Sequence, residues 1–337
     1  MTVDARLFSL VVPVMNEEEV LADTYATLQE ILQTIDMPYE VIVVDNGSTD
    51  RSPEIMRSLC QSDSRWKYIR LSRNFGYQNS ITAGMCAAAG DAIMVIDCDL
   101  QDPPELIPEF IAKWREGNDV VYGVRSHRTG ESLLRIFPTM MAMRVISWMS
   151  DDVKLPLHSS DFRLISRRVR DAYQDLPETT RYVRGLIHWL GFRQVGVPYV
   201  RRGRLKGESK VNWRYLVDFT FNAISNFSVR PMRMFSIFGA SILTLTGVLA
   251  VVYAALSFFL SPPPGLTTVL ILLLANLGLT SLGFGVVGEY IGKIYMESKR
   301  RPLWLVDYSV NIAPPTVTRQ PASEVHAPDS VAIRRAA

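Results

Sequence analysis

The sequence predicts an α/β protein with a mainly parallel sheet and helices on both faces, followed by interface helices and a two-helix transmembrane hairpin. Three observations predict this fold class. Short β-branched runs alternate with amphipathic stretches from residue 7 to about 123, as in parallel sheets covered by helices. Polar loops follow the strand candidates. Two long uncharged runs then occupy residues 234–260 and 266–288.

The elements of the sheet can be assigned in chain order. Strands are expected at 8–12, 40–44, 67–71, 92–96 and 119–122. Apolar residues recur at helical spacing over 20–35, and three glutamates at 17–19 lie in the first turn, where the helix dipole favours acids. Further helices fit 50–60, 78–89, 104–116, 132–149 and 180–190. In such a doubly wound sheet, ligands bind at the carboxyl ends of the strands.

The two uncharged runs predict helices that cross a bilayer core of roughly 30 Å. The proline turn at 261–265 is too short to hold a domain, so the two runs should form a hairpin. Basic residues flank both ends, and the positive-inside rule then predicts a multi-pass inner-membrane protein with both termini in the cytoplasm. The alternative is a buried helical hairpin in a soluble protein.

The chain therefore divides into four expected parts. These are a cytosolic domain at 1–200, a basic loop and amphipathic interface helix at 201–233, the hairpin at 234–292, and a cytosolic tail at 293–337 whose end is rich in Pro, Ser, Ala and charge and expected to be disordered. Residues 1–6 run into an apolar segment too short for a signal peptide, which agrees with a cytosolic first part.

Composition excludes several classes of function. The chain has 337 residues with 36 basic and 34 acidic side chains, so no overall positive field predicts a nucleic-acid partner. Three cysteines and four histidines lack the spacing of a disulfide framework or a zinc site. A reducing compartment without structural zinc is the simpler interpretation.

One strand candidate ends in two carboxylates, Asp97 and Asp99, which Gln101 follows. Side chains two residues apart in extended backbone project to the same side, so both acids can face one cation. Carboxylate and amide oxygens are hard ligands that suit Mg²⁺ or Mn²⁺. Such an ion neutralises a departing diphosphate. The alternative is that the acids only begin a loop and cap the next helix.

Three more polar loops follow strand candidates, at 12–18, 44–50 and 71–76. With the acid pair, they resemble the motifs of the family 2 glycosyltransferases of Rossmann-like GT-A fold, particularly polyprenyl-phosphate glycosyltransferases such as dolichol-phosphate mannose synthases and bactoprenol glucosyltransferases. The resemblance covers about 8–301, although Asn46 departs from the usual aspartate. It implies a metal held by Asp97, Asp99 and Gln101, and a nucleotide-sugar site that includes these three and Pro13, Met15, Glu17, Asp45, Asn46, Arg73 and Arg125.

The same resemblance implies an acceptor side. Arg125 matches a phosphate-binding position and Asp161 matches the second acidic active-site residue, so Asp99 and Asp161 are the candidate catalytic residues; the alternative for Asp161 is a capping or buried hydrogen-bonding aspartate. From their spacing, Arg135 and Thr139 would share a helix face and could add to this side, the alternative being an exposed helix face. A basic segment resembles the family's mobile acceptor loop; its candidate lipid-phosphate ligands are Arg201, Arg202, Arg204, Lys206, Ser209 and Lys210. The alternatives are a solvated basic loop or a patch attracted to anionic lipid.

The resemblance implies sugar transfer from a nucleotide sugar, UDP-glucose first, to undecaprenyl phosphate with inversion. UDP-GlcNAc, a modified UDP-aminoarabinose and GDP-mannose are alternative donors, and an inactive membrane scaffold is the alternative of another class. A lipid monophosphate with a second pKa near roughly 6 is largely ionised at neutral pH, so Asp161 can orient the acceptor rather than deprotonate it. The expected partners are the nucleotide sugar, the polyprenyl phosphate and the bilayer, and the resemblance allows a homotetramer.

Overall fold

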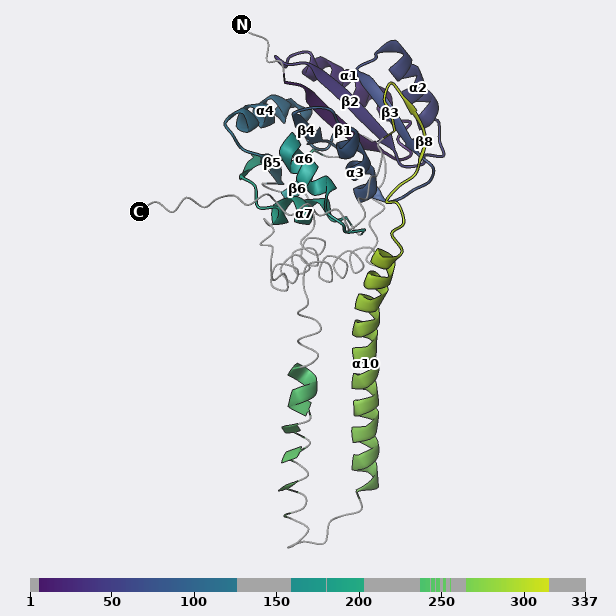
Figure 1. The fold of residues 1–337 in the computed structure, drawn as a ribbon, viewed down its shortest axis with the longest axis vertical. Coiled ribbons are helices and arrows are strands. Elements are labelled where there is room, and N and C mark those ends of the chain that lie inside the picture. The colour runs from purple at the N-terminus through teal and green to yellow at the C-terminus, as the bar shows by residue number, and fades with distance from the viewer. Residues whose placement is uncertain are drawn as a thin grey trace, which may run out of the picture.

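The computed structural model describes residues 6–125, 159–179, 181–202 and 265–314, together with short helical pieces between 237 and 255 (Figure 1). Most of these residues form one sheet covered by helices, from which a long helix projects. The predicted helix at 132–149 lies outside the described residues.

The sheet is mixed, and its described strands follow the order β7-β5-β6-β4-β1-β2-β3-β8. Strands β1 to β4 pair in parallel, as do β5 and β7, whereas β6 runs antiparallel to β4 and β5, and β8 runs antiparallel to β3. The strands are β1 (Phe8–Val14), β2 (Tyr39–Asp45), β3 (Trp66–Leu71), β4 (Ala92–Val95), β5 (Val120–Arg125), β6 (Ser159–Ser166), β7 (Gln194–Tyr199) and β8 (Val306–Val310).

Helices cover both faces of the sheet, and the strand sequences show why. Every residue of β1 is buried, and Leu10 and Val12 join one apolar cluster while Val11 joins the other. This alternation follows from the two-residue period of a strand. One cluster is completed by α1 (Leu21–Leu32), α2 (Ser52–Ser62) and α4 (Ile107–Arg115), and the other by α3 (Tyr77–Ala87), α6 (Arg167–Gln174) and α7 (Val183–Trp189).

The first half of the chain confirms the sequence-based assignment. All five predicted strands are present, and helices occupy the four predicted stretches up to residue 116, the last of which opens with the short helix η1 (Pro104–Leu106). The predicted helix at 180–190 is α7. The predicted mainly parallel sheet is mixed: most of its described pairings are parallel, but β6 inserts antiparallel between β4 and β5.

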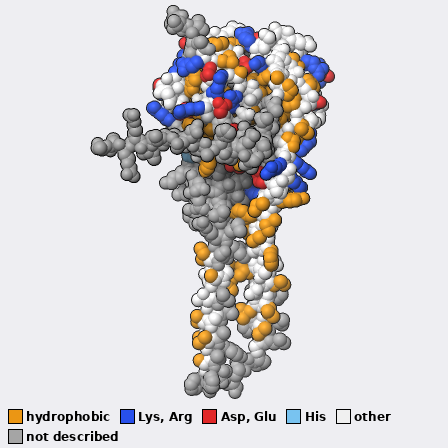
Figure 2. Space-filling view, in the orientation of Figure 1, with side chains coloured by type: hydrophobic (Ala, Val, Ile, Leu, Met, Phe, Trp, Pro, Cys, Tyr) orange, Lys and Arg blue, Asp and Glu red, His pale blue; other side chains and the backbone are white. Residues whose placement is uncertain are grey.

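A long helix, α10 (Leu266–Ser298), projects from the domain (Figure 1) and carries exposed apolar side chains along its length (Figure 2). Its last turns connect to the domain, where Thr179 donates two hydrogen bonds, from N and Oγ1, to Glu297 Oε1 at 2.6 and 2.5 Å.

The membrane prediction is corrected by the structure. A helix needs about 20 consecutive, predominantly apolar residues to cross a bilayer core. Within the ranges given above, no helix is both long enough and apolar enough to do so. The hairpin predicted at 234–260 and 266–288 is therefore unsupported, and the predicted multi-pass location in the inner membrane is overturned.

The segment after α10 returns to the domain and completes its core. Trp304 is buried in the cluster that contains Ile69, and β8 pairs with β3 at the edge of the sheet. The Tyr308 ring lies 5.8 Å from the Tyr68 ring, and Asn311 Nδ2 donates to the carbonyl oxygens of Cys60 and Trp66 at 2.6 and 2.9 Å. Part of the stretch expected to be a tail thus covers an edge strand.

Candidate functional site

Four loops meet where β1 to β4 end. Asn46, directly after β2, donates its backbone N–H to Val14 O at 2.9 Å and its side-chain amide to Asn74 Oδ1 at 3.0 Å. Its Oδ1 accepts from the Phe75 N–H at 2.9 Å. The Asn16 N–H donates to Ser48 Oγ at 3.0 Å. The loops after β1, β2 and β3 are therefore one hydrogen-bonded unit, as the strand order predicts.

Asp45 lies beneath this unit and is fully buried. Its Oδ1 accepts from the Ser48 N–H at 2.7 Å, and its Oδ2 accepts from the Tyr68 hydroxyl at 2.5 Å and lies 3.9 Å from Arg70 Nη1. Burial and the neighbouring carboxylate raise the pKa of Tyr68, so its hydroxyl stays a donor. The carboxylate holds the turn after β2 in shape, and its predicted contact with a nucleotide stays a prediction.

The other predicted nucleotide ligands surround the same edge. Pro13 lies within β1, and the exposed Met15 directly follows the end of that strand. The Glu17 N–H donates to Ser52 Oγ at 3.1 Å. Asn74 Nδ2 lies 3.2 Å from Met15 Sδ, and the Arg73 guanidinium lies over the Phe75 ring at 4.1 Å from its centroid. Their role in binding a nucleotide stays a prediction.

Gly47 permits the close approach of two of these loops. Its φ is +78°, and a Cβ atom there would lie 2.6 Å from the Arg73 carbonyl carbon and 2.9 Å from Arg73 Cα. We expect Gly47→Ala to lower the free energy of unfolding by about 2–4 kcal/mol. Alanine is strained in the left-handed conformation of Gly47, and its Cβ atom would also displace the main chain of Arg73. Chemical denaturation measures this loss.

Gly117→Ala is the matched control. Gly117 also has positive φ, at +91°, but its added Cβ would meet only Arg193 Nη1 at 3.9 Å. We expect this variant to lose about 1–2 kcal/mol from backbone strain alone. Equal losses in the two variants would show that loop contact contributes nothing.

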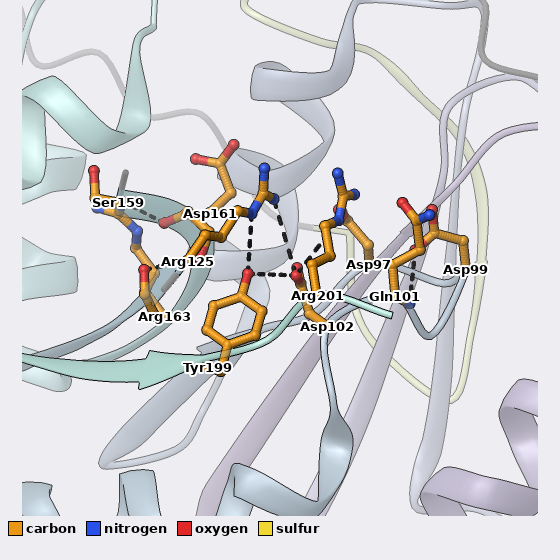
Figure 3. A network of polar contacts seen from close by, with 12 residues as sticks. Asp97, Asp99, Gln101, Asp102, Arg125, Ser159, Asp161, Arg163, Tyr199 and Arg201 are labelled. Carbon is orange, nitrogen blue, oxygen red and sulfur yellow. Dashed lines mark hydrogen bonds and ion pairs between the residues drawn. The ribbon is translucent and has the colours of Figure 1, made fainter. Parts of the chain in front are cut away.

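The predicted metal ligands follow β4 in a tight turn. Leu100 adopts positive φ, at 51°, and the Gln101 N–H donates to Asp99 Oδ1 at 3.2 Å. In Figure 3, the Asp97, Asp99 and Gln101 side chains lie together on one side of a polar network. Asp97 also accepts a short hydrogen bond from the Tyr77 hydroxyl. The turn thus gathers two carboxylates and one amide oxygen.

This oxygen set fits a hard divalent cation. Burial first, and then the negative charges of Asp102, Asp99 and Asp161, raise the pKa of Asp97 to about 7. A cation would relieve that repulsion, and Mg²⁺ and Mn²⁺ prefer such oxygen donors. Within the described residues, no cluster of three or more His, Cys, Asp or Glu side chains is arranged for metal binding. The predicted set has two acids and an amide.

Asp102 is the centre of a buried network beside this turn (Figure 3). Its Oδ1 accepts from the Tyr199 hydroxyl at 2.5 Å, and it lies 3.9 Å from Arg125 Nη2 and 3.8 Å from Arg201 Nε. Arg125 Nε also donates to the Tyr199 oxygen at 3.1 Å. The Arg202 N–H donates to Gln101 O at 2.9 Å. Two predicted acceptor residues, Arg201 and Arg202, therefore lie against the predicted metal turn.

Asp161 lies in β6, on the other side of the network in Figure 3. Arg184 from α7 contacts both of its oxygens, Nε donating to Oδ1 and Nη2 to Oδ2, each at 3.0 Å. Burial raises the pKa of Asp161, but the charges of Arg184, Arg163 and Arg125 outweigh it and lower the pKa overall. This carboxylate is therefore ionised.

Four side chains of the site are not predicted from the sequence: Tyr77, Asp102, Arg184 and Tyr199. Asp102 directly follows the predicted metal motif, so its position was a usable signal. The other three reach the site only because α3, α7 and β7 pack around β4 and β6. The remaining predicted ligands, Arg135, Thr139, Arg204, Lys206, Ser209 and Lys210, lie outside the described residues.

Comparison with known proteins gives a consistent set of relatives. Residues 9–173 match the family described as glycosyl transferase family 2. An uncharacterised glycosyltransferase of Bacillus subtilis, YkcC, is 44% identical over 308 residues, covering 90% of this chain and 94% of its own. The bactoprenol glucosyl transferase of Shigella phage SfV is 36% identical over 301 residues, covering 88% and 97%.

Among solved structures, glucosyl-3-phosphoglycerate synthase of Mycobacterium tuberculosis, in complex with Mn²⁺, UDP-glucose and phosphoglyceric acid, matches with a TM-score of 0.48 at 20% sequence identity. The match covers 66% of this chain and 78% of that one.

Proposed function

Because the chain belongs to glycosyl transferase family 2, we propose that it transfers glucose from UDP-glucose to a polyprenyl phosphate such as undecaprenyl phosphate. The observation that carries the proposal is the hydrogen bond from the Arg202 N–H to Gln101 O, which joins the basic segment to the acid turn. A donor diphosphate and an acceptor phosphate can then meet between them. The relative named bactoprenol glucosyl transferase supports the choice of sugar and lipid.

The donor would occupy the carboxyl ends of β1 to β4. Its base and ribose would lie on the loops that carry Pro13, Met15, Glu17, Asp45, Asn46 and Arg73. Asp97, Asp99 and Gln101 would hold Mg²⁺ or Mn²⁺, which when bound supplies positive charge to the diphosphate. On this side, the residues of the chain would hold the donor so that the anomeric carbon of the sugar faces Arg125 and Asp161.

The acceptor phosphate would lie on the opposite side of the network, among basic groups. Arg125 is held by Tyr199 and Asp102, so its guanidinium has a fixed direction. Arg201 and Arg202 begin the basic segment and are partly exposed. Guanidinium groups bind phosphate oxygens through paired hydrogen bonds, which suits a phosphate monoester.

The proposed chemistry is a single displacement. An oxygen of the lipid phosphate forms a bond to the anomeric carbon while the bond from that carbon to the diphosphate oxygen breaks. The electron pair of the broken bond leaves with the nucleoside diphosphate. Attack from the opposite face converts an α-linked donor into a β-linked lipid-phospho-sugar. No proton has to be removed, because the phosphate is largely ionised at neutral pH.

A donor panel tests this function. The purified full chain in detergent is given polyprenyl phosphate, Mg²⁺ or Mn²⁺, and in turn UDP-glucose, UDP-GlcNAc, a UDP-aminoarabinose and GDP-mannose. We expect a lipid-linked glucose, whose β configuration can be read from its NMR coupling. Product with a different donor alone would overturn the choice of glucose. Nucleotide binding without product from any donor would favour the inactive scaffold and overturn the enzyme.

A further inference from the structure

The contact between Arg184 and Asp161 fixes the orientation of the Asp161 carboxylate. Arg184 contacts Asp161 through two parallel hydrogen bonds, and its remaining Nη1 donates to Ser159 O at 2.9 Å. The Asp161 side chain is 8% exposed and that of Arg184 is 23% exposed. Paired contacts of this kind combine charge with a fixed orientation, and they are stronger than a single neutral hydrogen bond.

Every element around Asp161 adds to this arrangement. Cationic Arg125 faces it from β5, Arg163 from β6 and Arg184 from α7, whereas the other titratable neighbours are the acid Asp97 and the neutral Tyr77 and Tyr182. Arg163 is itself buried, and its Nη2 donates to Ser160 O at 2.8 Å. Within the part of the chain that the structure describes, the positive charge around Asp161 therefore exceeds the negative charge of Asp97.

A general base needs an oxygen that can approach and accept the proton of the nucleophile. Both Asp161 oxygens already accept from a cation, so a proton placed on either would neutralise the carboxylate and weaken its charge-assisted contacts with Arg184. The same contact prevents the carboxylate from rotating. The geometry thus suits an immobile anion.

We propose that Arg184 is a positioning residue of the transfer reaction: it holds Asp161 as a fixed anion that orients the acceptor side of the site and takes no proton. This inference rests on the proposed function. It assigns the nucleophile's ionisation to the acceptor phosphate alone. At a saturating metal concentration, which would keep Asp97 ionised, the acid limb of the rate then follows the second ionisation of that phosphate, at about pH 6.

The test is the pH profile of kcat/KM for wild type, Arg184→Lys and Asp161→Asn with the same lipid phosphate and donor. Lysine keeps the charge but loses the paired geometry, so we expect Arg184→Lys to lower kcat about 100-fold with little change in the donor KM. The acid limb should keep its position in both variants. An acid limb that disappears in Asp161→Asn would identify Asp161 as the base and overturn the proposal, as would full activity in Arg184→Lys.

Arg168→Lys is the matched control for the loss of a paired contact. Arg168 in α6 donates to both oxygens of Asp119, but this pair lies at the amino end of β5, away from the four loops. We expect kcat/KM to change less than about twofold. Equal losses in Arg168→Lys and Arg184→Lys would overturn the positioning role. Melting temperatures and nucleotide binding of each variant monitor folding.

The two proposals fail in different ways. If wild type makes no lipid-linked sugar with any donor, the proposed function fails. If wild type is active and Arg184→Lys retains that activity, only the role of Arg184 fails.

Discussion

Replacing Asp99 with asparagine is expected to lower kcat/KM for sugar transfer about 1,000-fold, since losing a ligand to the charge-neutralising ion removes several kcal/mol of stabilisation from the departing diphosphate. Asparagine keeps an oxygen in nearly the same volume, and that oxygen can still accept from the Gln101 N–H, as Asp99 Oδ1 does. The loss should therefore appear in activity rather than in stability. Initial rates with rising Mn²⁺ concentration measure it.

Asp36→Asn provides the control for removing one acidic charge. Asp36 is exposed, pairs with Arg115 and precedes β2, at the end of the sheet opposite the candidate site. We expect its kcat/KM to match wild type. Unchanged transfer by Asp99→Asn at low metal concentration would contradict the assignment of Asp99 to the metal.

Replacing Asp102 with alanine is expected to lower the free energy of unfolding by about 3 kcal/mol and to abolish most transfer. The carboxylate is buried and balances Arg125 and Arg201, so its removal leaves charged groups without their acceptor. It also removes the acceptor of the Tyr199 hydroxyl, whose pKa is raised to about 12, first by burial and then by Asp102. Urea denaturation and the lipid-transfer assay measure the two effects.

Glu105→Ala is the comparison for Asp102→Ala. Glu105 pairs with Arg202, but both side chains are more than half exposed, at 52% and 55%. An exposed pair contributes about 0–1 kcal/mol, so this variant should remain close to wild type in stability. A loss in Glu105→Ala as large as in Asp102→Ala would contradict the importance of burial in the network.

Much of the fold could be predicted because the first five strands are apolar and β-branched. Strand β6 could not, since Ser160, Asp161 and Arg163 are buried polar residues whose partners come from other elements. An isolated sequence gives no sign that such side chains are satisfied inside a sheet. The meeting of the loops after β1 to β4 could be predicted from the strand ends, whereas the positions of Arg184 and Tyr199 depend on packing that no local pattern encodes.

The antiparallel pairing of β8 with β3 has a consequence for biosynthesis. Asn311 lies 245 residues after its partner Trp66. At a translation rate of about 5–20 residues per second, β3 waits on the order of 10 to 50 s for the strand that covers it. Until then it presents unpaired main-chain groups, a ready template for unwanted association. The nascent chain therefore passes through a period in which β3, with Tyr68 and Ile69, is open to association with other chains. A chaperone that covers β3 during this period would favour folding over aggregation.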